Sequence, residues 1–283
     1  MVLVDLKTGR RTPWPGPRLV GFPTLDPSGR RLYYTAEHGG SIAIWVQEID
    51  GGRPEGDPRP LCEQAGQVGK LAVSPDSKWI VYYVVTGERR DLWRVPASGG
   101  VPSRLTDGPG RSIHPALSTD GQALAFVSDR DGSLRVWTMP VAGGAPARVT
   151  SGPGSDLFPE WSPNGKALAF TRNEDNTSDA WTAPADGSGR ESRWTRNVSA
   201  RRVMWDSESG GLLVAGTWGG DRLELRLVAS PGATPQPLTH PIVFGDAQAM
   251  GDFSLTRDGR SLAYIEESRR GDIWLLEART GTF

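Results

Sequence analysis

The chain has 283 residues, of which 37% are hydrophobic and 23% are charged. Its 32 basic and 33 acidic residues leave a formal net charge of −1 and are scattered along the sequence, so we expect neither nucleic acid nor an anionic membrane as its partner. The N-terminus has no basic leader and the chain has no long apolar run, so we expect neither a signal peptide nor a membrane span.

The first expected element is a short strand within residues 1–14. Residues 1–9 are similar in sequence to residues 273–281, and both segments match the third strand and hairpin of a repeat found along the whole chain. Because the last copy of that repeat ends without a fourth strand, we expect residues 2–6 to pair with it and close a ring. The alternative is that the chain is cut from a longer array, with residues 1–14 forming the tail of a preceding copy.

A small turn followed by an apolar strand recurs six times along the chain. The turns begin at intervals of 48, 44, 44, 44 and 50 residues. Most of them contain an Asp or Asn, which bonds its own backbone, and a Gly, which tolerates positive φ. A fixed period near 44 residues indicates supersecondary units that bury their apolar faces only against neighbouring units. The first residues of the turns are Asp26, Ser74, Ser118, Ser162, Asp206 and Thr256.

Four short strands are expected in each copy. A strand with apolar residues two apart precedes the turn, as at Leu71 and Val73, and a continuous apolar run follows it, as at residues 124–126. A third strand carries a large apolar residue in register, and a fourth, polar strand follows a Gly-rich hairpin. Four strands at this period are typical of a propeller blade. The third-strand residues are Trp45, Trp93, Trp137, Trp181, Leu225 and Trp274.

The sequence therefore predicts an all-β fold, a six-bladed β-propeller of four-stranded antiparallel blades. Its ring would be closed by the N-terminal strand pairing with the C-terminal blade. We expect a single domain over residues 1–283. The blades are expected near residues 19–62, 69–106, 113–150, 157–195, 201–239 and 251–283, with the N-terminal strand taken from residues 1–14.

Several motifs together resemble the TolB-like propeller repeat, a WD-repeat-like family. They are the Ser-Pro-Asp-Gly type of turn, the Leu-Ala-Phe strand, Ser128-Asp129-Arg130-Asp131-Gly132, the Trp of the third strand and the Gly-Gly before Arg-Leu-Thr. The resemblance covers essentially the whole chain. It implies a six-bladed propeller, and it also implies an interaction platform, because TolB-like propellers commonly serve as one.

The chain lacks the sequence motifs of common catalytic and cofactor sites. Its three histidines have no metal-ligand spacing, and neither a Gly-x-Ser-x-Gly elbow nor a phosphate-binding Gly-rich loop is present. We therefore expect no enzyme activity, no metal and no cofactor. The alternative is calcium at the acidic loops 129–132 and 173–179, although neither follows the EF-hand pattern. The single cysteine, Cys62, excludes an intrachain disulfide.

One position recurs just before the first strand of every copy and is the candidate binding site. Equivalent positions of a propeller lie around its axis, near one mouth of the channel. Aromatic, basic, acidic and imidazole groups that converge there would form a recognition surface, whereas the alternative is six unrelated strand ends. We call these six residues the mouth positions, and they are Phe22, Lys70, His114, Phe158, Arg202 and Asp252.

These observations predict a non-enzymatic scaffold that binds a protein or peptide through its loops and the axial channel mouth. We expect a monomer, and the sequence leaves the periplasm and the cytoplasm open as compartments. The first alternative is the accessory propeller of a larger enzyme, such as a prolyl-oligopeptidase-like peptidase, whose catalytic domain lies elsewhere. The second is a polysaccharide lyase or another metal-assisted enzyme built in the channel.

Overall fold

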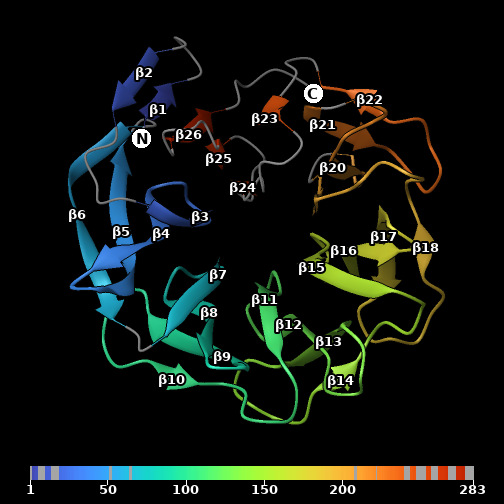
Figure 1. The fold of residues 1–283 in the computed structure, drawn as a ribbon, viewed down its shortest axis with the longest axis horizontal. Helices are drawn as coiled ribbons and strands as arrows, with labels where there is room; N and C mark the ends of the chain where they lie inside the picture. The colour runs from blue at the N-terminus through green and yellow to red at the C-terminus, as the bar shows by residue number, and fades with distance from the viewer. Residues whose placement is uncertain are drawn as a thin grey trace. The chain divides into compact units, whose positions relative to one another are not determined.

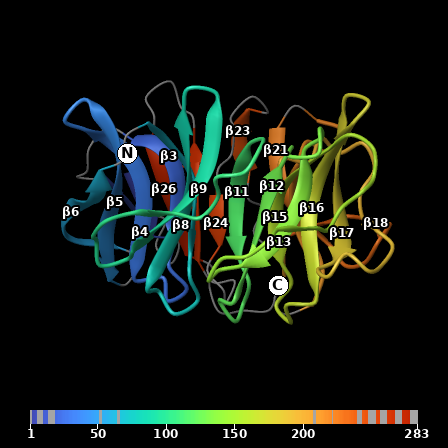
Figure 2. The ribbon, with the colours of Figure 1, turned by 90° about the horizontal axis from the view of Figure 1, so that it is seen from below.

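The computed structural model describes residues 2–5, 10–13, 19–50, 53–63, 66–206, 209–220, 222–238, 243–246, 253–255, 261–266 and 272–277. Within these residues the regular elements are all β-strands (Figure 1, Figure 2). The described residues include no helix that is long and apolar enough to cross a membrane. The chain divides into two compact units. Unit 1 holds residues 1–107 and 250–282, and unit 2 holds residues 108–249 and 283.

The described residues of unit 1 form two four-stranded antiparallel sheets, a three-stranded sheet and a hairpin. Blade 1 runs in the order β3 (Leu19–Leu25), β4 (Arg31–His38), β5 (Ser41–Asp50) and β6 (Arg53–Glu63). Blade 2 runs in the order β7 (Gln67–Val73), β8 (Trp79–Thr86), β9 (Arg89–Pro96) and β10 (Ser103–Arg104). The three-stranded sheet consists of β24 (Phe253–Leu255), β25 (Ser261–Glu266) and β26 (Asp272–Glu277). The hairpin consists of β1 (Val2–Asp5) and β2 (Arg10–Pro13).

In unit 2 the part of the chain that the structure describes forms three sheets, blades 3 to 5. Blade 3 runs in the order β11 (Ser112–Leu117), β12 (Ala123–Ser128), β13 (Arg135–Pro140) and β14 (Ala147–Arg148). Blade 4 runs in the order β15 (Ser155–Trp161), β16 (Ala167–Glu174), β17 (Thr177–Pro184) and β18 (Ser192–Arg193). Blade 5 runs in the order β19 (Arg202–Trp205), β20 (Leu212–Gly216), β21 (Arg222–Val228) and β22 (Gln236–Pro237), and β23 (Val243–Asp246) also pairs with β21.

The all-β class is confirmed, but the predicted number of six four-stranded blades is wrong. Among the described residues, five sheets contain four successive strands, whereas the C-terminal sheet contains three. The predicted fourth strand of that sheet pairs elsewhere: β1 forms a ladder with β2, from Val2 opposite Pro13 to Asp5 opposite Arg10. β1 lies beside β26, but no ladder between them is among the described sheets. A local hairpin closes a far shorter loop than pairing between opposite ends of the chain, so it costs less chain entropy.

The recurring turn is held by the side chain of its first residue. In blade 3 the backbone N–H of Ala123 donates to Ser118 Oγ (2.9 Å), and Ser118 Oγ donates to Asp120 Oδ1 (2.5 Å). The same two bonds recur 44 residues earlier and 44 residues later. The Ser118 hydroxyl lowers the pKa of Asp120 because it stabilises the carboxylate. Gly121 then adopts a φ of +71°, a conformation that costs residues with a Cβ about 1 kcal/mol or more.

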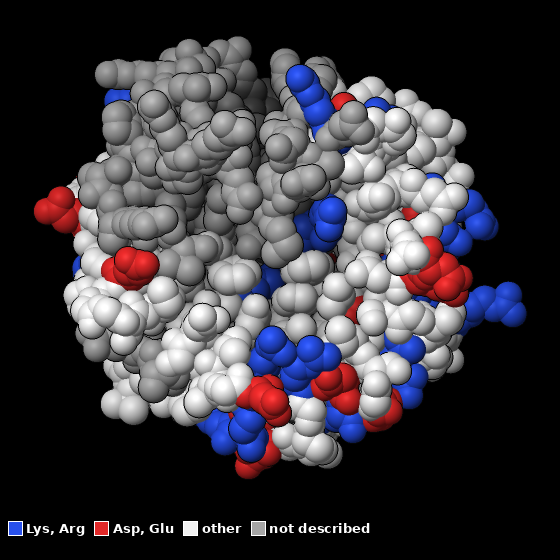
Figure 3. All heavy atoms as spheres, viewed as in Figure 1, with Lys and Arg blue, Asp and Glu red and all other residues white. Residues whose placement is uncertain are grey.

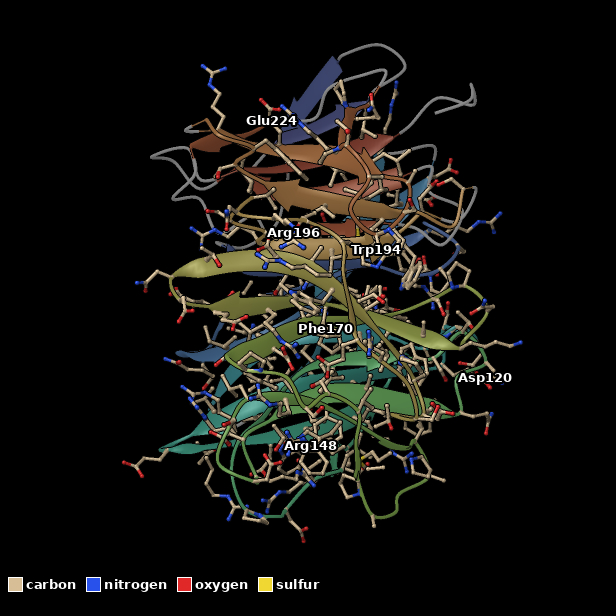
Figure 4. All side chains as sticks on the ribbon, turned by 90° about the vertical axis from the view of Figure 1, so that its right-hand side faces the viewer. Asp120, Arg148, Phe170, Trp194, Arg196 and Glu224 are labelled. Carbon is tan, nitrogen blue, oxygen red and sulfur yellow. The ribbon has the colours of Figure 1, made fainter. Side chains whose placement is uncertain are left out.

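Neighbouring blades of one unit bury their apolar faces against each other. Phe170 of β16 is fully buried and packs in one cluster with Ala125 of blade 3. On the other side of blade 4, Trp194 packs with Val203 and Val214 of blade 5. Figure 4 labels Phe170 and Trp194 among the strands of these blades. Each blade of unit 2 therefore depends on the next for its core, as expected of a repeat fold.

Two tryptophans also bond neighbouring blades directly. Trp161 Nε1 donates to the carbonyl oxygen of Ala116 (3.0 Å), and Trp205 Nε1 donates to that of Glu160 (3.2 Å). The two donors are 44 residues apart and so are the two acceptors. Because these bonds are directional, they set the height of β15 against β11 and of β19 against β15. Height here means the relative position of two strands along the strand direction.

A buried ion network, Asp156, Arg172 and Glu191, fixes the segment between blades 3 and 4. Arg172 is 1% exposed and donates twice to the fully buried Asp156 (2.6 and 2.9 Å) and once to Glu191 (2.5 Å). Glu191 accepts a further bond from the backbone N–H of Ser151 (2.6 Å). Burial alone would raise the pKa of Glu191, but the bonds from Arg172 and Ser151 hold that pKa below its ordinary value.

Gly121→Ala is expected to lower the free energy of unfolding by about 1 kcal/mol, because alanine must adopt the left-handed φ that glycine tolerates. Gly108→Ala is the matched control, since a Cβ at Gly108 meets no atom within 4 Å and its φ lies outside the left-handed range. Urea denaturation of the two variants measures the difference. Equal loss of stability in both would contradict this account of the turn.

Glu191→Gln is expected to destabilise the protein most near neutral pH. A depressed pKa means that ionised Glu191 adds stability above its unfolded-state pKa, and that this stability is lost as the pH falls through the lower folded-state pKa. The stability gap to the wild type should therefore narrow below about pH 4.5, the ordinary value for the group. Urea midpoints across this range measure the gap, with Glu174→Gln at the end of β16 as the control. A gap independent of pH would rule out this role.

Candidate functional site

The six mouth positions divide between the two units. Two of the residues lie on first strands in unit 1, and three lie on first strands in unit 2. Convergence of all six around one axis stays a prediction. Unit 1 holds Phe22 on β3 and Lys70 on β7, unit 2 holds His114 on β11, Phe158 on β15 and Arg202 at the start of β19, and Asp252 lies outside the described residues.

A β-bulge redirects the side chain at most mouth positions. The register of the first strand shifts around Phe22, Lys70, His114 and Phe158 and is continuous at Arg202. In three of these bulges an aromatic residue precedes a proline and has a positive φ, 57° at Phe22, 51° at His114 and 52° at Phe158. Proline suits a bulge because it has no N–H to leave unpaired. Bulky residues rarely adopt such a φ, so these strands hold their aromatic side chains at a cost of about 1 kcal/mol or more each.

In unit 2 the mouth residues of three successive blades form one continuous stack. The ring centroids of His114 and Phe158 are 4.0 Å apart, and the ring planes are inclined by 18°. The Arg202 guanidinium also lies on the Phe158 ring, with Cζ 5.0 Å from its centroid. His114 and Phe158 are half-buried, whereas Arg202 is 8% exposed. Ring stacking and the cation–π contact join these residues, the stacked triad, into one surface.

In unit 1 Phe22 lies beside an aromatic side chain that the sequence analysis missed. Phe22 packs edge to face with Tyr83 of β8, with the ring centroids 6.3 Å apart. A Cβ on Gly69 would lie 1.9 Å from Tyr83 Cζ, so the tyrosine ring fills the space that a side chain at residue 69 would need. Lys70, next to this glycine, is 8% exposed. The available signal was the glycine itself, because blades 3 and 4 have branched aliphatic residues at the equivalent place.

Two charged residues close in sequence to the stacked triad form ion pairs within unit 2. Asp156, two residues before the phenylalanine of the triad, is held by Arg172 in the ion network. Arg111 Nε donates to Asp129 (2.6 Å). Burial would raise the pKa of Asp129, but bonds from Arg111 hold it below its ordinary value. Figure 3 shows basic and acidic side chains next to one another over much of the described part of one face. The triad therefore offers ring faces and a guanidinium rather than a strong field of one sign.

The described side chains include no group of three His, Cys, Asp or Glu that could hold a metal ion. In each acidic loop considered for calcium, a carboxylate forms an ion pair with an arginine. Asp131 accepts a hydrogen bond from Arg148 (2.6 Å), and Asp179 accepts one from Arg193 (2.5 Å). Calcium binding stays a prediction that these contacts do not test. Cys62 is buried, and burial raises the pKa of its thiol to about 11, so the thiol is a poor nucleophile.

The chain is similar to known proteins both in sequence and in fold. The TolB homolog of Chlorobium chlorochromatii (strain CaD3) is 29% identical over 114 residues, which are 38% of this chain and 23% of the relative. The crystal structure of TolB from Acinetobacter baumannii matches with a TM-score of 0.61 and 17% identity, over 76% of this chain and 55% of the other. The chain thus spans less than two thirds of these relatives. At this identity the structural likeness shows the fold alone.

A second structural neighbour is part of an enzyme. The structure of a puromycin-hydrolyzing peptidase from Mycobacterium tuberculosis matches with a TM-score of 0.65 and 20% identity. The match covers 89% of this chain and 44% of the peptidase chain. The same fold therefore occurs as one part of a longer chain.

A family model decides the assignment. The model of the TolB beta propeller domain matches residues 16–197, which is more than half of the sequence. Within that range lie the recurring turns of blades 1 to 4 and the bulged first strands that carry the aromatic mouth residues. The chain belongs to the TolB beta propeller domain family.

Proposed function

We propose that this chain is a non-enzymatic scaffold that binds a protein or peptide partner through the stacked triad and the loops next to it. The observation that carries the proposal is the stack itself: His114, Phe158 and Arg202 come from three blades, yet their planar groups are in contact. Aromatic residues and arginine are the types that most often dominate the energy of protein interfaces.

The backbone supports this assignment independently of the side chains. Positive φ angles at His114 and Phe158 cost stability, and burial does not compensate fully because both side chains are only half-buried. Strained positions of this kind are frequent at ligand-binding sites. The surrounding sheets provide a rigid frame from which loops and strand ends can contact a partner. For Phe22, Lys70 and Asp252, a role at an axial mouth stays a prediction.

The non-enzymatic part of the proposal is supported by the sequence, which lacks the motifs of a serine hydrolase and of common cofactor sites. A second candidate function is favoured by the peptidase neighbour, whose chain is more than twice as long as the part that matches. In that case the chain would be the accessory propeller of a larger enzyme. A hydrolase domain encoded next to it in the same reading frame would support this candidate.

The proposed function is tested by selecting peptides from a random displayed library on the purified chain. We expect the enriched peptides to bind Phe158→Ala about 30-fold more weakly, because truncating a central aromatic contact costs about 2 kcal/mol. Arg202→Met should weaken binding as well, since it removes the cation over the ring. Isothermal titration calorimetry with the synthesised peptides measures each dissociation constant.

The matched control is Arg196→Ala, an exposed arginine of the same unit (Figure 4) that follows the outer strand β18 and is not part of a first strand. It should leave the dissociation constant unchanged. Thermal melts establish that each variant is folded at the temperature of the titration. If no peptide is enriched, or if the peptides bind the folded Phe158→Ala and Arg202→Met variants as tightly as the wild type, the triad is not the binding surface.

A further inference from the structure

The outer edge of blade 1 differs from the outer edges of the other four-stranded blades. β6 has 11 residues, whereas β10, β14 and β18 have 2 residues each, and the outer edge of blade 5 is divided between β22, with 2 residues, and β23, with 4. β6 is the last strand in the order of its sheet, so one of its edges is open among the described residues of unit 1. A long open edge is a template for another strand, and a second copy of this chain would bring an identical edge.

Three prolines interrupt this edge. Pro54 lies opposite Ile49 and Pro60 lies opposite Trp45 in the ladder with β5, and Pro58 lies between them. A proline in an edge strand has its nitrogen on the side away from the ladder. Pro54 and Pro60 therefore remove N–H donors from the open edge. Residues 53–60 are all exposed or half-buried, so the edge is accessible to solvent.

A bulge interrupts the same strand. The ladder between β5 and β6 shifts its register between Val46 and Glu48. Gln47, which is fully buried, holds this irregularity by donating through Nε2 to the carbonyl oxygens of Glu55 (2.8 Å) and Gly56 (3.2 Å). Gly56 has a φ of +65°. The bulge breaks the regular row of backbone groups that an added strand would need.

We propose that Pro54, Pro58 and Pro60, together with the bulge held by Gln47, keep blade 1 from pairing edge to edge with a second copy of this chain. The pairing that they prevent is symmetric, with β6 of one copy antiparallel to β6 of the other. The other four-stranded blades do not need such residues, because outer strands of two to four residues offer too few backbone groups to start a ladder.

The test replaces Pro54, Pro58 and Pro60 together by threonine, which favours strands and restores three N–H donors. In sedimentation equilibrium the wild type should have the 30.6 kDa mass of one chain. The triple variant should shift toward twice that mass as its concentration rises. Amide hydrogen exchange should then slow within residues 53–60 of the associated variant. The control, which should not associate, replaces three exposed prolines outside strands, Pro109, Pro153 and Pro231.

A folded triple variant that keeps the mass of one chain at every concentration overturns the proposal. A wild type that already associates with slow exchange at β6, or a control that associates as strongly as the triple variant, overturns it as well. Circular dichroism establishes folding. If the triple variant does not fold, the single variants Pro54→Thr and Pro60→Thr are measured in the same way, and the same masses decide the outcome.

Discussion

The second strand of each blade is excluded from water only when other sheets cover both of its faces. β12 and β16 are buried along most of their length, as is typical of strands inside a stack of sheets. Because these apolar faces must be buried, the sheet of each repeat packs against the sheet of the next at a fixed distance between sheets. The stacked triad follows from it, because residues that are 44 positions apart come into contact only when their strands lie side by side at equal height.

Apolar contact alone does not fix that height, since hydrophobic attraction has no direction. The bonds from Trp161 to Ala116 and from Trp205 to Glu160 do fix it, because each has a single geometry at the boundary between two blades. Arg172 adds a buried ionic contact between β16 and the start of β15. A buried ion pair contributes little net stability, but a displaced arrangement would leave its charges unpaired. The register on which the triad depends is thus held by polar groups inside an apolar stack.

Local residues determine what could be predicted from the sequence. The turn at Ser118 and its equivalents is encoded by three or four neighbouring side chains, so the turns and the strands between them were predictable. The number of four-stranded blades was not, because it depends on whether residues 2–5 pair with a near or a distant strand. His114, Phe158 and Arg202 hold the same register in successive repeats, but the stacking of His114 on Phe158 depends on backbone bulges. Tyr83 was missed because it comes from a second strand, outside that register.

Tyr83 and Gly69 also limit how freely the repeats can be exchanged. The tyrosine ring occupies the volume of the side chain that the glycine lacks, and it contacts Phe22 of the blade before it. Recombination that carried one of these positions into another copy without its counterpart would create either a clash or a void. Duplication of whole blades therefore lengthens such an array without disturbing this contact. A crossover within blade 2 would instead separate Gly69 from Tyr83, whose packing depends on each other.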